Sequence, residues 1–433
     1  MSSLIDAPRP DPLELLAQQE SQRLPWLLPI RHGRMVRDPF AFFRGAAVVM
    51  AADLAQRPHS GLMVQLCGDA HLLNFGFYGS PERQLLFDIS DFDETHPGPF
   101  EWDVIRLATS LVLAARSLAL SDKQQSRICR RGVRAYAEAM ATFASMPVMQ
   151  MWTIRLQPSE LLDQLASSNF RSHLRTLMDD AHRHTSRQAI DKLCESSSNG
   201  ALRFRHEPPL IWRFEELPEQ WLTGLDWQAW AASADSLYRQ QLSPTMRTLM
   251  AHFHLDDAAL KAIGVGSVGT RCAINVLVGD HPDDVLVLQG KQVEPSVLAP
   301  YVNTQAPEHQ GERVVQGQRL MQTASDPFLG WTTNPEGQHL YIRQFRDWKA
   351  SVAISELNDD GLKDYGKLCG WTLAKAHARS GDRRAITAWI EDPKQFSRAI
   401  AELAFQHADQ VAVDHQAFVQ AIRTGRIQAS DLE

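Results

Sequence analysis

The chain has 433 residues, of which 44% are hydrophobic and 22% are charged, a composition typical of a globular protein with room for two or three domains. Lysine and arginine number 44 against 51 aspartates and glutamates, so the formal net charge is −7. This acidic balance argues against nonspecific binding to nucleic acid or to an anionic membrane, and it favours a soluble enzyme that acts on small molecules or proteins.

Cysteine usage and the N-terminal sequence indicate the compartment. The five cysteines are odd in number and include no CxxC pair, which argues against a disulfide framework or a cysteine zinc site and favours a reducing environment. The first residues contain no basic region followed by an apolar stretch, and no run of about 18 apolar residues occurs anywhere. We therefore expect a cytoplasmic protein without a membrane span.

Short predicted elements occupy the first part of the chain. Residues 39–57 are rich in alanine and carry apolar residues at helical spacing, which predicts one helix. Residues 62–66 predict a short strand and the sequence QLLFDIS a second one, with a loop between them. From residue 103 to about 146 the pattern is helical, and Ser121 is the expected N-cap of the second helix in this stretch.

The stretch from residue 67 to 103 concentrates carboxylates and amides. Asp69 precedes Asn74 by five positions, and Asp91 and Asp93 follow the strand QLLFDIS. Phosphoryl transfer from ATP needs one carboxylate that orients the nucleophile, and a second carboxylate with an amide oxygen that hold Mg²⁺ against the phosphates. The spacing predicts Asp69 as catalytic base and Asn74 and Asp91 as metal ligands, with Asp93 as an alternative ligand. A polar surface loop in which Asp and Asn are turn residues is the competing interpretation.

The middle of the chain is predicted to be mainly helical. Residues 158–195 and 226–260 have helical patterns, separated by the flexible sequence SSSNG and an extended segment at 201–214. Ser243 followed by Pro244 predicts the start of a helix, with serine as N-cap and proline in the first turn.

The pattern changes at residue 262 to strand, glycine turn, strand, turn and strand. The glycine turn contains Gly264, Gly266, Ser267 and Gly269 in a GxGxxG string. A dinucleotide-binding loop requires a helix directly after such glycines, but TRCAINVLVGD predicts a strand. Lys291 lies at the end of the next apolar strand. The pattern favours a kinase-type glycine loop over ATP phosphates, with Lys291 holding the α- and β-phosphates. A plain tight hairpin and an exposed lysine at a strand end are the alternatives.

A glutamate that pairs with Lys291 is expected on the following helix, near residues 311–324. Glu312 is the first candidate for this partner, and Glu294 is the second. Further predicted elements are the strand HLYIRQF and helices at 361–380 and 394–406.

Two resemblances follow from these motifs. GDAHLLNFG followed by DISDFDETHPGPFEWD resembles the GDxHxxN…IDFDD…GP…D signature of aminoglycoside- and choline-type kinases. This resemblance implies that Asp69 matches the catalytic aspartate, Asn74 and Asp91 the metal-binding residues, and Asp103 the buried aspartate that supports the catalytic loop. The longer motifs RGAAVVMAADLA, GVGSVGTR and CGWTLAKAHARSGD are similar to the bacterial family called domain of unknown function 2252, from about residue 31 to 410.

The order of the motifs is reversed relative to such kinases, in which the glycine loop and lysine precede the catalytic aspartate. The resemblance therefore implies a circularly permuted α+β, kinase-like fold with a small antiparallel-sheet lobe and a larger helical lobe. We expect the N-terminal part with the catalytic and metal loop to span 1–110, and a helical region that forms a substrate-site insert to span 111–257. The sheet lobe is expected at 258–350 and the C-terminal helices at 351–433.

We expect an ATP- and Mg²⁺-dependent phosphotransferase that acts on an unidentified small-molecule or protein acceptor, and the carboxylates favour a cationic one. Three alternatives remain: AMP transfer on the same fold, nucleotide binding without turnover, or metal-dependent hydrolysis through Asp69, His71, Asp91 and Asp93. Lys291 and Asp91 are 200 positions apart (291 − 91). One ATP–Mg²⁺ unit would bring their side chains to within roughly 10 Å of each other.

Overall fold

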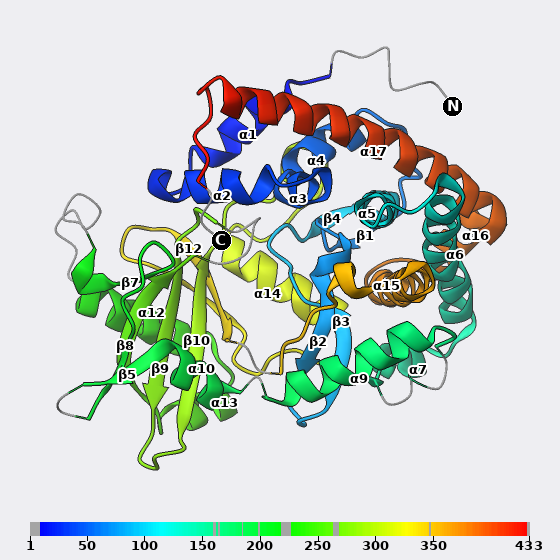
Figure 1. Ribbon diagram of the computed structural model, residues 1–433. Coiled ribbons are helices and arrows are strands. Elements are labelled where there is room, and N and C mark those ends of the chain that lie inside the picture. The colour runs from blue at the N-terminus through cyan, green and yellow to red at the C-terminus, as the bar shows by residue number, and fades with distance from the viewer. Residues whose placement is uncertain are drawn as a thin grey trace.

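The computed structural model describes residues 9–158, 162, 165–183, 185–197, 200–217, 227–262, 268–345 and 348–430. These residues form an α+β fold in which a six-stranded sheet lies beside a larger helical part, as Figure 1 shows. The α+β class and the antiparallel sheet expected from the sequence are confirmed. Within the described residues, no helix is both long enough and apolar enough to cross a bilayer.

The large sheet is entirely antiparallel and has the strand order β11-β12-β10-β9-β8-β7. Its strands span Ile211–Arg213 (β7), His254–Lys261 (β8), Cys272–Val278 (β9), Val285–Gln292 (β10), Gly330–Thr333 (β11) and His339–Gln344 (β12). The hairpin between β9 and β10 closes at the predicted turn, where the backbone N–H of Gly279 donates to the carbonyl of Asp284 at 2.8 Å. The alternation of apolar and polar residues in the sequence therefore indicated the central hairpin correctly.

Helices cover the two faces of this sheet. Helix α12 (Trp227–Gln241) packs with α13 (Pro244–Met250) on the face that carries Leu286 and Leu288, while α10 (Ser186–Leu193) covers the face that carries Val287. Side chains alternate between faces along a strand, so Lys291 lies on the same face as Val287. That face is turned toward the helical part of the molecule, and α14 (Gln310–Met321) lies between the two parts (Figure 1).

The helical part is built from both ends of the chain. Its core helices are α5 (Phe100–Ser117), α6 (Asp122–Ser145), α15 (Asp359–Ser380), α16 (Arg383–Ile390) and α17 (Pro393–Arg423). Helix α5 is buried on all sides from residue 100 to 115, which explains why its sequence lacks a polar stripe. Helices α6 and α15 cross closely, because a Cβ atom on Gly370 would lie 2.2 Å from the carbonyl oxygen of Gly132. The predicted helix at 361–380 therefore packs in the part that carries Asp69.

The described residues before the first strand form four short α-helices: α1 (Pro12–Glu20), α2 (Leu28–Met35), α3 (Pro39–Gly45) and α4 (Ala47–Ala55). Helix α3 packs on both α5 and α17, and α1 packs on α17. Two small ladders follow, β1 (Met63–Leu66) with β4 (His96–Pro99) and β2 (Phe75–Gly79) with β3 (Leu85–Ile89). The described residues also form α7 (Val148–Thr153), α9 (Ser168–Arg183) and the paired strands β5 (Cys194–Ser196) and β6 (Leu202–Phe204). The ladders position the two loops that carry the predicted site.

Several predicted boundaries were wrong. The single helix expected at 39–57 is interrupted at Ala46, where φ is −117° and ψ is 41°, so α3 and α4 are separate. The helix expected at 226–260 stops at Met250, because the following residues pair with β9 as strand β8 and a tertiary contact overrides the local pattern. The N-caps at Ser121 and Ser243 are confirmed; Ser243 accepts a hydrogen bond from the backbone N–H of Met246.

Candidate functional site

The loop after β1 is held by a buried aspartate on α5. The carboxylate of Asp103 accepts hydrogen bonds from the backbone N–H groups of Cys67 and Gly68, at 2.7 and 3.0 Å. Its Oδ2 atom also lies 3.2 Å from Nε2 of His377 on α15. Gly68 has a φ of +82°, and a Cβ there would lie 2.1 Å from the carbonyl oxygen of Glu94, so the turn requires glycine. Asp103 thus supports the loop in the way the resemblance implied.

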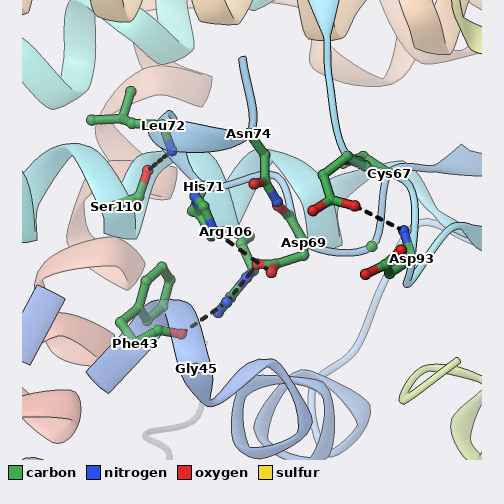
Figure 2. Close-up of polar contacts among 12 residues, drawn as sticks. Phe43, Gly45, Cys67, Asp69, His71, Leu72, Asn74, Asp93, Arg106 and Ser110 are labelled. Atoms are coloured by element: carbon green, nitrogen blue, oxygen red, sulfur yellow. Dashed lines mark hydrogen bonds and ion pairs between the residues drawn. The ribbon is translucent and has the colours of Figure 1, made fainter. Parts of the chain in front are cut away.

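Asp69 lies in this loop with one carboxylate oxygen engaged, as Figure 2 shows. The Nε atom of Arg106 donates to Oδ1 of Asp69 at 2.6 Å, and the same guanidinium donates to the carbonyl of Phe43 at 2.9 Å. On the other side, Nε2 of His71 lies 3.7 Å from Oδ2 of Asp69. The side-chain amide of Asn74 donates to the carbonyl of Asp69 at 2.7 Å. Asp69 and Asn74 are therefore fixed relative to each other, and no described residue donates a hydrogen bond to the side-chain oxygen of Asn74.

The second loop, between β3 and β4, carries Asp91 and Asp93. Arg313 of α14 donates to the backbone carbonyls of Asp93 and Glu294, at 2.9 and 3.0 Å, and so joins this loop to the end of β10. Burial alone would raise the pKa of Asp91, but the positive charges of nearby basic side chains, Lys291 foremost, outweigh it and lower the pKa to about 2. Asp91 is accordingly ionised at neutral pH.

Lys291 reaches the second loop from the sheet. Its ammonium group forms an ion pair with Asp93, and the other carboxylate oxygen of Asp93 accepts a hydrogen bond from the hydroxyl of Tyr341 at 2.9 Å. Burial lowers the pKa of Lys291, but the charges of Asp93, Tyr341 and Asp91 raise it more strongly, so the lysine stays protonated. Since only 3% of Lys291 is exposed, the alternative of an exposed lysine at a strand end is wrong.

The expected partner of Lys291 was also wrong. Glu312 is half-buried on α14 and accepts a hydrogen bond from the amide of Gln316 at 2.7 Å, one turn along the same helix. Glu294, the second candidate, accepts from the amide of Gln292. The structure instead pairs Lys291 with Asp93, a residue that was predicted only as a possible metal ligand.

One cavity of about 510 Å³ brings the predicted residues together. It lies between the sheet and the helical part and is lined by the candidate residues Asp69, Asn74, Asp91, Asp93 and Lys291. Arg343 of β12 and Lys349, which follows that strand, line it as well. Sequence reasoning missed Arg106 and Arg313, although an arginine inside an otherwise apolar helix, as at Arg106, is a usable signal for a buried ion pair.

The glycine turn is described only at its end. Gly264, Gly266 and Ser267 lie outside the described residues. Gly269 has a φ of +98°, its carbonyl accepts a hydrogen bond from the backbone N–H of Leu24 at 2.7 Å, and the next residue, Thr270, lines the cavity. The end of the turn therefore reaches the same cavity as Lys291.

The burial of His71 predicts a specific pH dependence of stability. Burial lowers the pKa of His71 to about 4, against an ordinary value near 6.5. Between pH 6.5 and 4 the unfolded chain therefore binds a proton at this residue that the folded chain does not, so stability falls as the pH falls through this range. The free energy of unfolding, measured in urea at several pH values, should depend less steeply on pH in the variant His71→Gln. The difference in slope should correspond to about one proton, or about 1.4 kcal/mol per pH unit. Identical slopes for the variant and the wild type would contradict this assignment.

A protein family described as an uncharacterised protein conserved in bacteria, domain of unknown function 2252 (DUF2252), matches residues 23–421. No curated protein and no solved structure matches the sequence. The matched range includes both loops, the large sheet and nearly all of the C-terminal helices, and it contains the candidate residues Asp69, Asn74, Asp91, Asp93 and Lys291.

Proposed function

The chain belongs to the bacterial family DUF2252, and we propose that it is a kinase-like phosphotransferase that uses ATP with Mg²⁺. One observation carries this proposal: a single cavity joins an Asp–Asn loop, a second acidic loop and a buried strand lysine from distant parts of the chain. The ion pair between Lys291 and Asp93 supports it further, since it links two of these parts directly. Phosphoryl transfer depends mainly on positioning and on charge stabilisation, and this arrangement supplies both.

Each residue has a role in the proposed reaction. Asp69 accepts the proton of an acceptor hydroxyl while the oxygen of that hydroxyl bonds to the γ-phosphorus of ATP. The bond between the γ-phosphorus and the oxygen that bridges it to the β-phosphate breaks, and ADP leaves. Arg106 keeps one oxygen of Asp69 occupied and so orients the carboxylate. Lys291 binds phosphate oxygens, and its pairing with Asp93 compensates its charge when no nucleotide is bound.

The donor atoms of the two loops suit Mg²⁺. Asn74, Asp91 and Asp93 supply oxygen atoms, which are the preferred ligands of this ion. Among the described residues, no three His, Cys, Asp or Glu side chains are grouped closely enough to hold a metal by themselves. Mg²⁺ commonly relies on substrate phosphates and water in addition to one or two carboxylates, so the site fits Mg²⁺ that arrives with the nucleotide. The metal would neutralise charge on the phosphates.

The order of elements supports a circular permutation of the kinase-like arrangement. The loop with Asp69 comes first in the chain, the strand with Lys291 follows, and α15 then returns to pack beneath the first loop. The hydroxyl of Tyr365 on α15 donates to the carbonyl of Leu72 at 2.7 Å, directly under that loop. The proposed lobes are therefore the large sheet with α14 and a helical lobe that includes both ends of the chain.

Nucleotide binding can be tested by thermal shift. ATP with Mg²⁺ at about 100 times its dissociation constant should stabilise the wild type by about 2.7 kcal/mol and raise the melting temperature. The variant Lys291→Met should lose most of this rise, because it keeps the apolar stem but lacks the charge that binds phosphate. Asp91→Asn should lose the part of the rise that depends on Mg²⁺.

The matched control is Lys394→Met, which removes an exposed lysine on α17 and should shift like the wild type. Equal shifts in Lys291→Met and the wild type would remove Lys291 from the nucleotide site.

If the nucleotide binds, the mass of the modified acceptor separates the remaining possibilities. A gain of phosphate supports the proposal, a gain of AMP indicates adenylyl transfer, and no product indicates a regulator without turnover.

A further inference from the structure

The C-terminal end of α3 lies directly beside the proposed base. Arg106 bridges Asp69 and the carbonyl of Phe43, with donor–acceptor distances of 2.6 and 2.9 Å. The guanidinium of Arg106 also stacks on the ring of Phe43, 4.0 Å from its centroid. Figure 2 shows Phe43 and Gly45 on the side of Asp69 to which Arg106 extends. The residue between them, Arg44, lines the same cavity as Asp69.

Arg44 has no protein partner in the part of the chain that the structure describes. Its Nε atom is buried and makes no hydrogen bond, and its guanidinium forms no ion pair with any described residue. Burial lowers the pKa of Arg44, and the negative charges of Asp69 and Asp38 oppose this effect, so a carboxylate lies close enough to act on it. Arg44 as a whole is half-buried, but a buried donor such as its Nε atom is costly unless a ligand supplies the missing acceptor.

Two further groups at this end of the cavity also lack partners among the described residues. Helix α4 begins at Ala47 without a side-chain cap, and the backbone N–H groups of Ala47 and Val48, which line the cavity, make no hydrogen bond to a described residue. The start of a helix favours negative charge through its unpaired N–H groups and its dipole. His71 is only 4% exposed and lines the cavity, and its Nδ1 atom makes no hydrogen bond to any residue that the structure describes.

The aspartates in the cavity are already compensated by positive charge, which argues against the cationic acceptor favoured by the sequence. Asp69 is paired with Arg106, and Asp93 with Lys291. Asp91 has no ion pair among the described residues, but it lies in the field of the positive charges of Lys291, Arg343 and Lys349. Glu94 accepts a hydrogen bond from a backbone N–H group at 2.8 Å. The charge that still lacks a counterion beside the proposed base is therefore positive.

We infer that the acceptor carries an oxyanion, a carboxylate or phosphate group, that binds to Arg44 and the N-terminus of α4 and so presents a hydroxyl to Asp69. The inference rests on the proposed function for the role of Asp69. The binding of the anion itself depends on Arg44 and α4 and does not require ATP. A planar guanidinium binds such groups through two parallel hydrogen bonds, which also fixes their orientation.

The test compares four small hydroxyl compounds by calorimetry, at low ionic strength, pH 7 and without nucleotide. D-glycerate and glycerol 3-phosphate carry the two oxyanions, glycerol is neutral, and choline is cationic. The wild type should bind at least one of the anionic compounds ten-fold or more tightly than glycerol or choline. Arg44→Met should lose at least ten-fold in that affinity, and Arg44→Lys should recover part of it, since lysine keeps the charge but not the two-pronged geometry. Arg130→Met, which removes an exposed arginine on α6, is the control.

Arg44→Met should fold, because no carboxylate loses its ion-pair partner in that variant, and circular dichroism checks this. Preferential binding of choline, or anion binding that Arg44→Met leaves unchanged, would overturn the inference. Thermal shift with ATP and Mg²⁺ on the same variants separates the two proposals. Anion binding through Arg44 without nucleotide binding supports the anion site and contradicts the phosphotransferase. Nucleotide binding without Arg44-dependent anion binding supports the phosphotransferase and contradicts the anion site.

Discussion

Replacing Asp69 with asparagine is expected to lower the rate of phosphoryl transfer about 10²–10⁴-fold while leaving the affinity for ATP and Mg²⁺ nearly unchanged. Asparagine has almost the same shape, but it cannot accept the proton of the acceptor hydroxyl. In the proposed site the nucleotide would bind through Lys291 and the second acidic loop, which this substitution does not alter. Single-turnover rates and the nucleotide dissociation constant, measured on the same preparation, test the two halves of this expectation.

The variant must be compared with the wild type at a temperature where both are folded. The side chain of Arg106 is only 3% exposed and would lose the charge of Asp69, so Asp69→Asn should also melt at a lower temperature. The control is Asp359→Asn, which removes a partly exposed carboxylate paired with Arg127 at the surface and should keep full activity. Turnover by folded Asp69→Asn at the wild-type rate would mean that the first loop is structural.

The second large effect is expected on stability. Lys375 of α15 forms an ion pair with Asp88 of β3, and both side chains are almost completely buried, with 1% and 4% exposed. In Lys375→Met the carboxylate of Asp88 would remain buried without its counterion, which typically costs about 3–5 kcal/mol. We therefore expect Lys375→Met to lower the free energy of unfolding in urea by about this amount at pH 7.

The double variant Lys375→Met/Asp88→Asn should recover most of the loss, because it leaves no buried charge and asparagine can still accept the hydrogen bond from the N–H of Ile89. For comparison, Arg134→Ala breaks an exposed i,i+4 pair with Glu138 on α6 and should cost about 0.5 kcal/mol or less. A double variant as unstable as the single one would show that packing, and not charge, accounts for the loss. Since β3 leads into the loop with Asp91, the single variant should also weaken Mg²⁺-dependent nucleotide binding.

The residues of the two loops were identified by local spacing. Asp69 and Asn74 lie in one turn of chain, where the amide of Asn74 reaches the carbonyl of Asp69 five residues earlier. Asp91 follows a short strand that pairs with the strand after Asn74, so the two loops meet at the same end of one hairpin. Contacts over so few residues depend on turn and strand geometry, which the residue types themselves specify.

The partner of Lys291 was decided by tertiary structure. Alternation along β10 indicates which residues share a face with Lys291, but it does not say what that face contacts. Asp93 lies 198 positions earlier (291 − 93) and reaches Lys291 only because α14 and the ends of the sheet pack onto the second loop. The residue predicted on α14 is one position away from the residue that contacts the second loop. Arg313 contacts that loop, whereas Glu312 accepts a hydrogen bond from Gln316. Neighbouring residues of a helix point about 100° apart, because the helix has 3.6 residues per turn.

The sequence alone thus determined the α+β class, the central hairpin, the two acidic loops and the buried aspartate Asp103, because each depends on a periodicity or on a motif a few residues long. Only the tertiary structure decided that Arg106 pairs with Asp69, that Asp93 pairs with Lys291, and that Arg44 lines the cavity without a partner among the described residues. These outcomes depend on which faces of α3, α5 and β10 meet. A buried charge is costly unless it is paired, so these contacts depend on how whole elements pack against each other, and no local pattern in the chain encodes that packing.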